Sequence, residues 1–264
     1  MSANHYAIEV EDLVAYYGSR RILDGVSLQV GYGEIMVIMG GSGSGKSTLL
    51  RHLLALQTPR SGSIRILGRD ITTASADMLH ELRQSIGVSF QGGALLSSLT
   101  IGENVALPLR EHTRLDDSII EITARLKLEI VSLGGFEHLY PAQLSGGMIK
   151  RAALARAMAM DPKMLFFDEP SAGLDPVVSS ELDDLIIKLR DTLGVTIVVV
   201  THELESAFKI ADHITVLDHG RILISGTADI VRNSSIERVQ DLLHRRSRPI
   251  EISADDYLHR LTGG

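Results

Sequence analysis

A glycine-rich segment carries the strongest chemical signal in this sequence. Residues 40–47 read Gly-Gly-Ser-Gly-Ser-Gly-Lys-Ser and fit the pattern G-x-x-x-x-G-K-(S/T). Glycines let successive backbone N–H groups curve around phosphate oxygens, and a helix that begins there points its positive end at them. Lys46 would neutralise charge on the β- and γ-phosphates, and the Ser47 hydroxyl would bind Mg²⁺. The segment therefore predicts a site for a nucleoside triphosphate.

Two adjacent carboxylates form a second candidate group. Asp168 and Glu169 follow the apolar run 164–167, which predicts a strand buried on both faces. In an open α/β sheet, ligands bind at the carboxyl ends of the strands. Asp168 suits the Mg²⁺ ligand shell, through water, and Glu169 suits a general base that polarises the attacking water. A phosphate loop alone could belong to a kinase, a GTPase or an ATPase motor; a GTPase would be expected to carry an N-K-x-D run, and this sequence has none.

A third segment, Leu-Ser-Gly-Gly-Met at 144–148, precedes an alanine-rich run that is predicted to be helical. Ser145, Gly146 and Gly147 place a hydroxyl and glycine N–H groups at another helix start, which is an anion-binding end. This start lies about a hundred residues after the first one. We expect the two to complete one shared site across a dimer.

The elements that position these groups follow from apolar periodicity and turn residues. Strands are predicted at residues 22–23, 26–30, 35–39, 164–167, 195–200, 214–217 and 222–224, with Asp24-Gly25 as a turn. One helix is predicted after Gly45, ending before Pro59, and another from Asp175-Pro176 to Gly194. Residues 75–160 are predicted to be mostly helical.

Strands that alternate with helices predict an α/β fold with a largely parallel sheet. The helical stretch at about 92–160 interrupts the alternation and is interpreted as an insertion. The expected domains are a discontinuous core at 1–91 and 161–230, a helical subdomain at 92–160 and a C-terminal tail at 231–264.

Composition excludes several classes of protein. The 264 residues contain 26 Lys and Arg against 33 Asp and Glu, a net charge of −7, which argues against a nucleic-acid partner bound by a broad basic face. Cysteine is absent, which excludes disulfides and thiolate chemistry. The apolar runs are shorter than the roughly 20 residues of a membrane-spanning helix, and no secretory signal is predicted.

Together the motifs resemble ABC-type ATPases over residues 6–230. The family's phosphate loop is matched by Gly40, Gly41, Ser42, Gly43, Ser44, Gly45, Lys46, Ser47 and Thr48, and its signature by residues 144–148. Its glutamine loop is matched by Gln91, its D-loop by residues 171–175 with Asp175, its switch histidine by His202, and its adenine-stacking aromatic by Tyr17. Met148 departs from the glutamine that most often ends the signature.

The resemblance implies a P-loop (RecA-like) core with an antiparallel β subdomain and an inserted α-helical subdomain. It implies a homodimer that holds ATP and Mg²⁺ between one chain's phosphate loop and the other chain's signature. Glu169, His202 and Lys46 would be catalytic, and Ser47, Gln91 and Asp168 would serve the metal.

Further stretches at 91–100, 108–113 and 144–156 resemble the ATPases of MCE-protein lipid transporters, including the Mla phospholipid system. This resemblance implies a peripheral subunit on the cytoplasmic face of the inner membrane. Its partners would be an integral membrane permease, a periplasmic MCE protein and a small STAS-domain protein. Residues 245–261 are hypothesised to grip the second ATPase subunit.

Three alternatives stay open on the sequence alone. The chain could serve a different importer or exporter, act on DNA or ribosomes, or bind ATP as a regulator without turnover. The second alternative expects coiled coils, paired ATPase halves or basic arms, and the sequence has none of them. Glu169 and His202 argue against the third.

Overall fold

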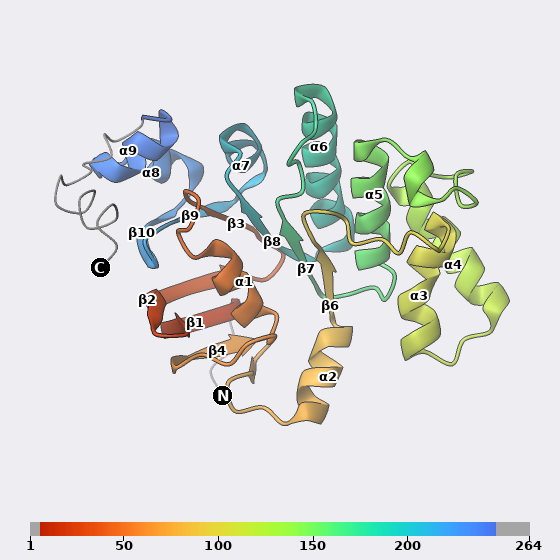
Figure 1. The fold of residues 1–264 in the computed structure, drawn as a ribbon, viewed down its shortest axis with the longest axis horizontal. Coiled ribbons are helices and arrows are strands. Elements are labelled where there is room, and N and C mark those ends of the chain that lie inside the picture. The colour runs from red at the N-terminus through yellow and green to blue at the C-terminus, as the bar shows by residue number, and fades with distance from the viewer. Residues whose placement is uncertain (1–5, 247–264) are drawn as a thin grey trace, which may run out of the picture.

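Two β-sheets organise the chain in the computed structural model, which describes residues 6–246 (Figure 1). The first sheet is antiparallel, in the order β2 (Arg20–Gly31), β1 (Tyr6–Tyr17), β4 (Ser61–Ile66) and β5 (Arg69–Asp70). The second has the order β10 (Arg221–Gly226), β9 (His213–Asp218), β3 (Ile35–Met39), β8 (Thr196–Thr201), β7 (Met164–Asp168) and β6 (Ile86–Ser89).

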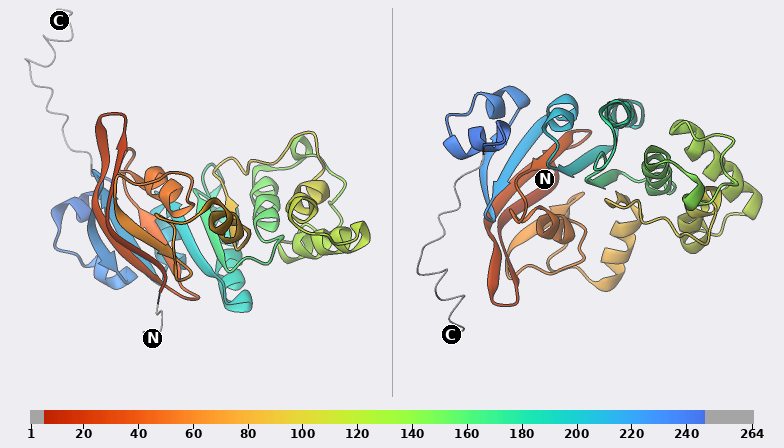
Figure 2. Two further views of the ribbon diagram at one scale, coloured as in Figure 1. Left: turned by 90° about the horizontal axis from the view of Figure 1, so that it is seen from below. Right: turned by 45° about the horizontal axis from the view of Figure 1, so that its top comes forward.

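Helices pack on both faces of the second sheet. They are α1 (Lys46–Leu53), α2 (Ala76–Gln84), α3 (Ile101–His112), α4 (Asp117–Ile130), α5 (Gly146–Ala157), α6 (Pro176–Leu193), α7 (Leu204–Ile210), α8 (Ala228–Arg232) and α9 (Glu237–Leu243), with a 3-10 turn at Pro141–Gln143. Figures 1 and 2 show α3, α4 and α5 together at one end of the molecule. Within residues 6–246, no helix is both long enough and apolar enough to cross a membrane.

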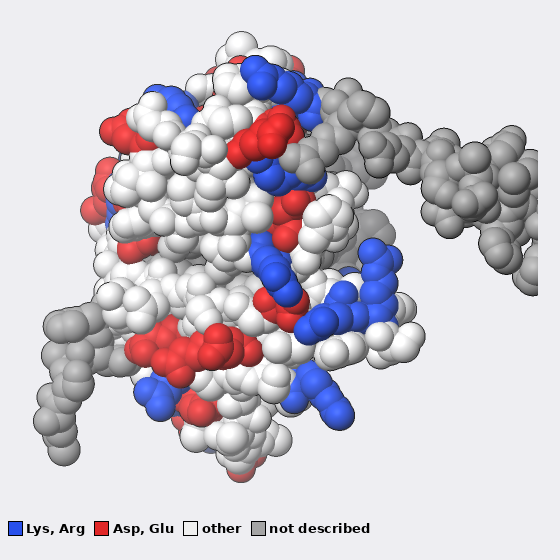
Figure 3. Space-filling model, turned by 90° about the vertical axis from the view of Figure 1, so that its left-hand side faces the viewer, with Lys and Arg blue, Asp and Glu red and all other residues white. Residues whose placement is uncertain are grey.

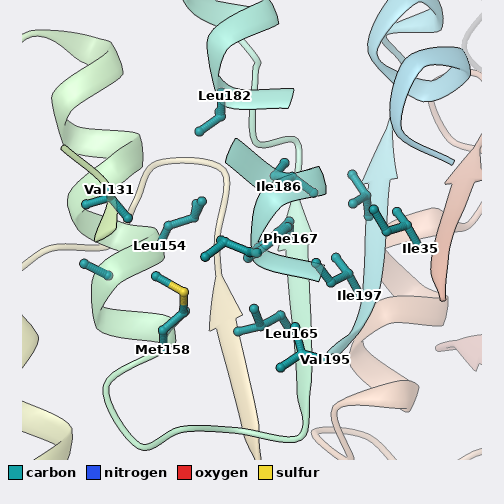
Figure 4. Close-up of a cluster of buried hydrophobic side chains, with 14 of the residues drawn as sticks. Ile35, Val131, Leu154, Met158, Leu165, Phe167, Leu182, Ile186, Val195 and Ile197 are labelled. Carbon is teal, nitrogen blue, oxygen red and sulfur yellow. The ribbon is translucent and has the colours of Figure 1, made fainter. Parts of the chain in front are cut away.

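The central strands β3, β7 and β8 of the second sheet are buried on both faces, as their continuous apolar runs predict. Alternate residues of β7 enter two different cores: Leu165 and Phe167 face α5 and α6, whereas Met164 and Phe166 face the antiparallel sheet and α1. Figure 4 shows Phe167 among side chains from α5, α6 and β8. The position of β7 is therefore held from both sides.

Strand direction determines where the site lies. The strands β3, β6, β7, β8 and β9 are parallel to their neighbours, and only β10 runs antiparallel to β9. The carboxyl ends of parallel strands share one edge of a sheet. The segments after β3, β6, β7 and β8 therefore lie at the same edge, which confirms the predicted α/β class with a largely parallel sheet.

The structure corrects three local predictions. Strand β6 interrupts the stretch that was predicted to be mostly helical, and strands β1, β4 and β5 were not predicted. The predicted turn at Asp24-Gly25 is wrong, because β2 continues through it with a β-bulge: β2 advances from Leu23 to Val26 while β1 advances only from Leu13 to Ala15. Gly25 has φ +69°, which glycine adopts without strain.

The helix that was expected from Asp175-Pro176 to Gly194 was predicted correctly. Asp175 caps α6 by accepting the backbone N–H groups of Val177 and Val178, both at 3.1 Å, and Pro176 opens the first turn. Gly194 ends the helix in the left-handed conformation, with φ 65°.

Ion pairs hold the last described elements against the sheets. Arg238 of α9 pairs with Asp218 at the end of β9 at 2.8 Å, and Arg221 of β10 pairs with Asp24 of β2 at 2.6 Å. Figure 3 shows acidic and basic side chains interspersed on this face of the molecule. Of residues 245–261, for which a grip on the second subunit was hypothesised, 247–261 lie outside the described residues.

Replacement of Phe167 by alanine should destabilise the protein by about 3–5 kcal/mol, because the ring is fully buried and the cavity cannot collapse between two packed layers. Urea unfolding, followed by circular dichroism, measures the free energy of unfolding. Phe136→Ala is the matched control, since that ring is 42% exposed, and it should change stability by less than about 0.5 kcal/mol. Equal losses in the two variants would contradict this account of the core.

Candidate nucleotide site

The glycine-rich loop connects β3 to α1 and is shaped to receive an anion. Gly43 and Gly45 have φ +74° and +110°, values that side-chain-bearing residues rarely adopt. A Cβ on Gly40 would lie 2.1 Å from the carbonyl oxygen of Leu217, so this position must also be glycine. Helix α1 begins at Lys46 without a side-chain cap, which leaves the N–H groups of its first turn available to a ligand.

Positive charge is held directly over this loop. The Lys46 ammonium donates to the carbonyl oxygens of Gly40 at 2.8 Å and Gly41 at 3.1 Å. Burial lowers the pKa of Lys46, while the carboxylates of Glu169 and Asp168 oppose that shift. The Lys46 ammonium is therefore held at the loop, where it interacts electrostatically with the carboxylates at the end of β7.

A buried hydroxyl in the loop lacks a partner. The Ser44 side chain is 3% exposed, and its Oγ forms no hydrogen bond within residues 6–246. An unsatisfied buried polar group is costly and rare in folded proteins. A phosphate oxygen at the loop would provide the missing partner.

Glu169 is buried directly after β7, and its carboxylate forms hydrogen bonds with residues at the end of β8. One carboxylate oxygen, Oε2, accepts the Thr201 hydroxyl at 3.1 Å and the backbone N–H of His202 at 3.3 Å. The other, Oε1, lies 2.8 Å from Nδ1 of His202. Glu169 has φ +49°, an uncommon conformation for a residue other than glycine. The carboxylate therefore has a defined position at the carboxyl edge of the sheet.

The environment of Asp168 disfavours the ionised form of its carboxyl group. Burial, followed by the negative charge of Glu169, raises the pKa of Asp168, and the nearby Lys46, Arg51 and Lys150 only partly oppose this shift. A carboxyl group in such a place gains from an additional positive charge close by.

Gln91 follows β6 and reaches this group through its backbone. Its carbonyl oxygen accepts the Lys150 ammonium of α5, and the same ammonium donates to the Glu169 carbonyl oxygen at 3.2 Å. Lys150 and Thr201 also belong to this group, although neither is part of a sequence motif that indicated the site. A lysine within the alanine-rich run after the signature was the available signal for Lys150.

The signature segment, residues 144–148, leads into α5, which packs on the face of the second sheet opposite to α1. Ser145 caps α5 by accepting the backbone N–H of Met148 at 3.3 Å. A Cβ on Gly147 would lie 2.6 Å from Val178 of α6, so this glycine also serves packing. In Figure 1, α5 and α1 lie on opposite sides of β7, so the structure does not bring the signature to the same chain's phosphate loop. Tyr17 is 77% exposed at the end of β1 and pairs with Arg20 of β2.

The fold and the site define a P-loop nucleotide hydrolase with an inserted helical region. The sequence model of the ABC transporter family matches residues 23–172. The intermembrane phospholipid transport system ATP-binding protein MlaF of Haemophilus influenzae is 39% identical over 98% of this chain and 99% of its own length. The probable ribonucleotide transport ATP-binding protein mkl of Mycobacterium leprae is 41% identical over 94% of this chain and 72% of its own length.

Among solved structures, a dimeric post-hydrolysis state of the ATP-binding cassette MJ0796 with ADP and Pi matches with a TM-score of 0.77. It is 32% identical, and the match covers 84% of this chain and 98% of that one. The chain therefore belongs to the ABC transporter ATP-binding family. It binds nucleotide and is an ATP hydrolase.

Proposed function

We propose that this chain is the ATP-hydrolysing subunit of a complex that moves phospholipid between the inner and outer membranes of a bacterium. The observation that carries the proposal is the likeness to the Haemophilus influenzae MlaF protein, which extends over 99% of that protein and 98% of this chain. Because the match extends beyond the ATPase core in both chains, it favours a shared transport function as well as shared ATP hydrolysis.

The loop residues would hold the phosphates of ATP, and Tyr17 would stack on the adenine. The residues around the phosphates are Gly40, Gly41, Ser42, Gly43, Ser44, Gly45, Lys46, Ser47 and Thr48. Three oxygen donors, Ser47, Gln91 and Asp168, would hold Mg²⁺, which prefers such ligands. The raised pKa of Asp168 fits a nearby cation, because that charge would stabilise the carboxylate. When bound, Mg²⁺ would neutralise charge on the β- and γ-phosphates.

Glu169 would act as the general base in hydrolysis. The water oxygen attacks the γ-phosphorus, the bond to the β–γ bridging oxygen breaks, and Glu169 takes the water proton, so that ADP and inorganic phosphate leave. Thr201 and His202 each contact one of the two carboxylate oxygens. The side chain of Glu169 is therefore already ordered before the reaction and loses less conformational entropy during it. Lys46 would offset charge on the transferring phosphoryl group.

Each site would be completed by a second copy of the chain. Ser145, Gly146 and Gly147 of one copy, with Asp175 of its D-loop, would face the nucleotide on the other copy. The helical subdomain at 92–160 would then move with the signature relative to the core at 1–91 and 161–230, which provides a nucleotide-driven two-state element.

The homodimer would bind peripherally to the cytoplasmic face of the inner membrane. There it would drive an integral membrane permease that assembles with a periplasmic MCE protein and a small STAS-domain protein. A second candidate, ribonucleotide transport, is favoured by the likeness to mkl, although that protein is longer than the matched region.

Purification of the native complex from membranes tests the two candidates. We expect a permease, an MCE protein and a STAS-domain protein to copurify with the chain, and ATP to drive the movement of labelled phospholipid in proteoliposomes. The matched control is the same complex with Glu169→Gln, which should not move lipid. ATP-dependent movement of ribonucleotide without movement of phospholipid would overturn the proposal in favour of the second candidate.

A further inference from the structure

Two basic side chains of α5 hold the backbone of the segment that follows β6. The Lys150 ammonium contacts the Gln91 carbonyl oxygen, and the Arg156 guanidinium donates to the carbonyl oxygens of Gly93 at 2.8 Å and Ala94 at 2.7 Å. Because α5 begins at the signature, this segment is fastened to the signature helix along two of its turns. A displacement of α5 would therefore displace Gln91.

The Lys150 ammonium also contacts the backbone of Glu169, directly after β7. Lys150 donates to the Glu169 carbonyl oxygen at 3.2 Å, so one side chain joins the residue after β6 to the residue after β7. Glu169 has φ +49°, a conformation that persists only where surrounding contacts impose it. The hydrogen bond from Lys150 is one of those contacts, and the direction of the Glu169 side chain depends on that backbone.

Lys150 is placed at an energetic cost. The residue is 6% exposed, and burial lowers the pKa of its ammonium while the carboxylates of Glu169 and Asp168 oppose that shift. A buried lysine is rare unless its charge is compensated by hydrogen bonds, and here two backbone carbonyls after separate strands accept two of its three N–H donors. An apolar side chain would suffice if the position served packing alone.

We infer that Lys150 is a positioning residue for hydrolysis, which links the signature helix to Glu169 and Gln91 of the same chain. Ser145, at the start of α5, would face the partner's ATP in the dimer, so this inference rests on the proposed dimeric function. Closure of one site would then be transmitted through α5 and Lys150 to the base of the other. Communication between the two ATP sites would pass through this side chain.

Lys150→Met tests the link, because methionine fills a similar volume without a donor. We expect kcat for ATP hydrolysis to fall about 10- to 100-fold, corresponding to the loss of charge-assisted hydrogen bonds. KM should change by less than about threefold, since phosphate binding does not use Lys150. ATP should still assemble the dimer, and the ATP-bound dimer should accumulate on size-exclusion chromatography because turnover is slow.

Two further variants separate positioning from packing. Lys127→Met is the matched control: Lys127 is also a buried lysine, 8% exposed, and its ion-pair partner Asp161 is exposed, so kcat should stay within about twofold of wild type. Lys150→Arg keeps a cation with several N–H donors and should recover at least about a third of wild-type kcat. Thermal melting of each variant shows whether the fold is intact.

The results distinguish the inference from the function on which it rests. Wild-type kcat in Lys150→Met would overturn the inference, as would a folded Lys150→Arg that is as slow as Lys150→Met. Loss of both ATP binding and thermal stability in Lys150→Met would assign the residue to packing and would also overturn it. Equal turnover by wild type and Glu169→Gln would instead reject the assignment of the hydrolytic site.

Discussion

Glu169→Gln should bind ATP but hydrolyse it about 10²- to 10⁴-fold more slowly than wild type, and its ATP-bound dimer should accumulate. Glutamine keeps the shape of the side chain, and its amide oxygen can still accept from Thr201, but the amide cannot take a proton from water. Phosphate release measures the rate, and size-exclusion chromatography with ATP measures the dimer. The effect should appear in kcat, because the phosphate loop is unchanged.

The neighbouring Glu203→Gln is the matched control for charge. Its carboxylate lies 3.7 Å from Nε2 of His202, whereas Glu169 lies 2.8 Å from Nδ1 of the same ring. Both variants remove one negative charge beside His202, but only Glu169 is buried at the carboxyl end of β7. We expect Glu203→Gln to keep turnover within about threefold of wild type. Ordinary turnover in Glu169→Gln would remove this residue as the base.

Lys46→Ala should abolish measurable ATP turnover, with a loss of about 10²-fold or more, and should weaken ATP binding as well. The ammonium is the positive side chain held over the loop, where it donates to Gly40 and Gly41, and no backbone N–H can replace its full charge. The comparison with Glu169→Gln is informative, since one variant loses binding and turnover together and the other loses turnover alone. Phosphate release and equilibrium binding of labelled ATP measure the two effects.

Lys188→Ala is the control for this substitution, because Lys188 is an exposed lysine of α6 that lies outside the site. It should match wild type in both assays. Thermal melting of Lys46→Ala should show a shift of only a few degrees, because loss of the two hydrogen bonds is partly offset by relief of the cost of burying the charge. A wild-type rate in Lys46→Ala would refute the assignment of the phosphate site.

The sequence alone determined the parts of the site that are built from consecutive residues. The segment from Gly40 to Ser47 had to follow a strand and lead into a helix, and it runs from the end of β3 into the first turn of α1. Asp168 and Glu169 had to end a buried strand, and Asp168 is the last residue of β7, with Glu169 directly after it. Such motifs are readable because the chemistry needs adjacent backbone groups at one turn, and local sequence specifies that turn.

Other local features escaped prediction for a physical reason. Strand β6 has only four residues between α2 and the Gln91 segment, which is too few for apolar periodicity to reveal it. The Asp24-Gly25 pair carries the composition of a turn, yet the same glycine conformation fits a bulge inside β2. The surrounding strands, and not the pair itself, decide between the two.

Only the tertiary structure decided which distant residues meet. The sheet order places β8 beside β7 and β7 beside β6, which brings Thr201 and His202 to the carboxylate of Glu169 and Gln91 to the same edge. Lys150 joins that group from a helix in another part of the fold. The order of strands in a sheet depends on packing between segments far apart in the chain, and no local pattern encodes it. The residue types that perform the chemistry could therefore be identified from the sequence, whereas the tertiary contacts that position their side chains could not.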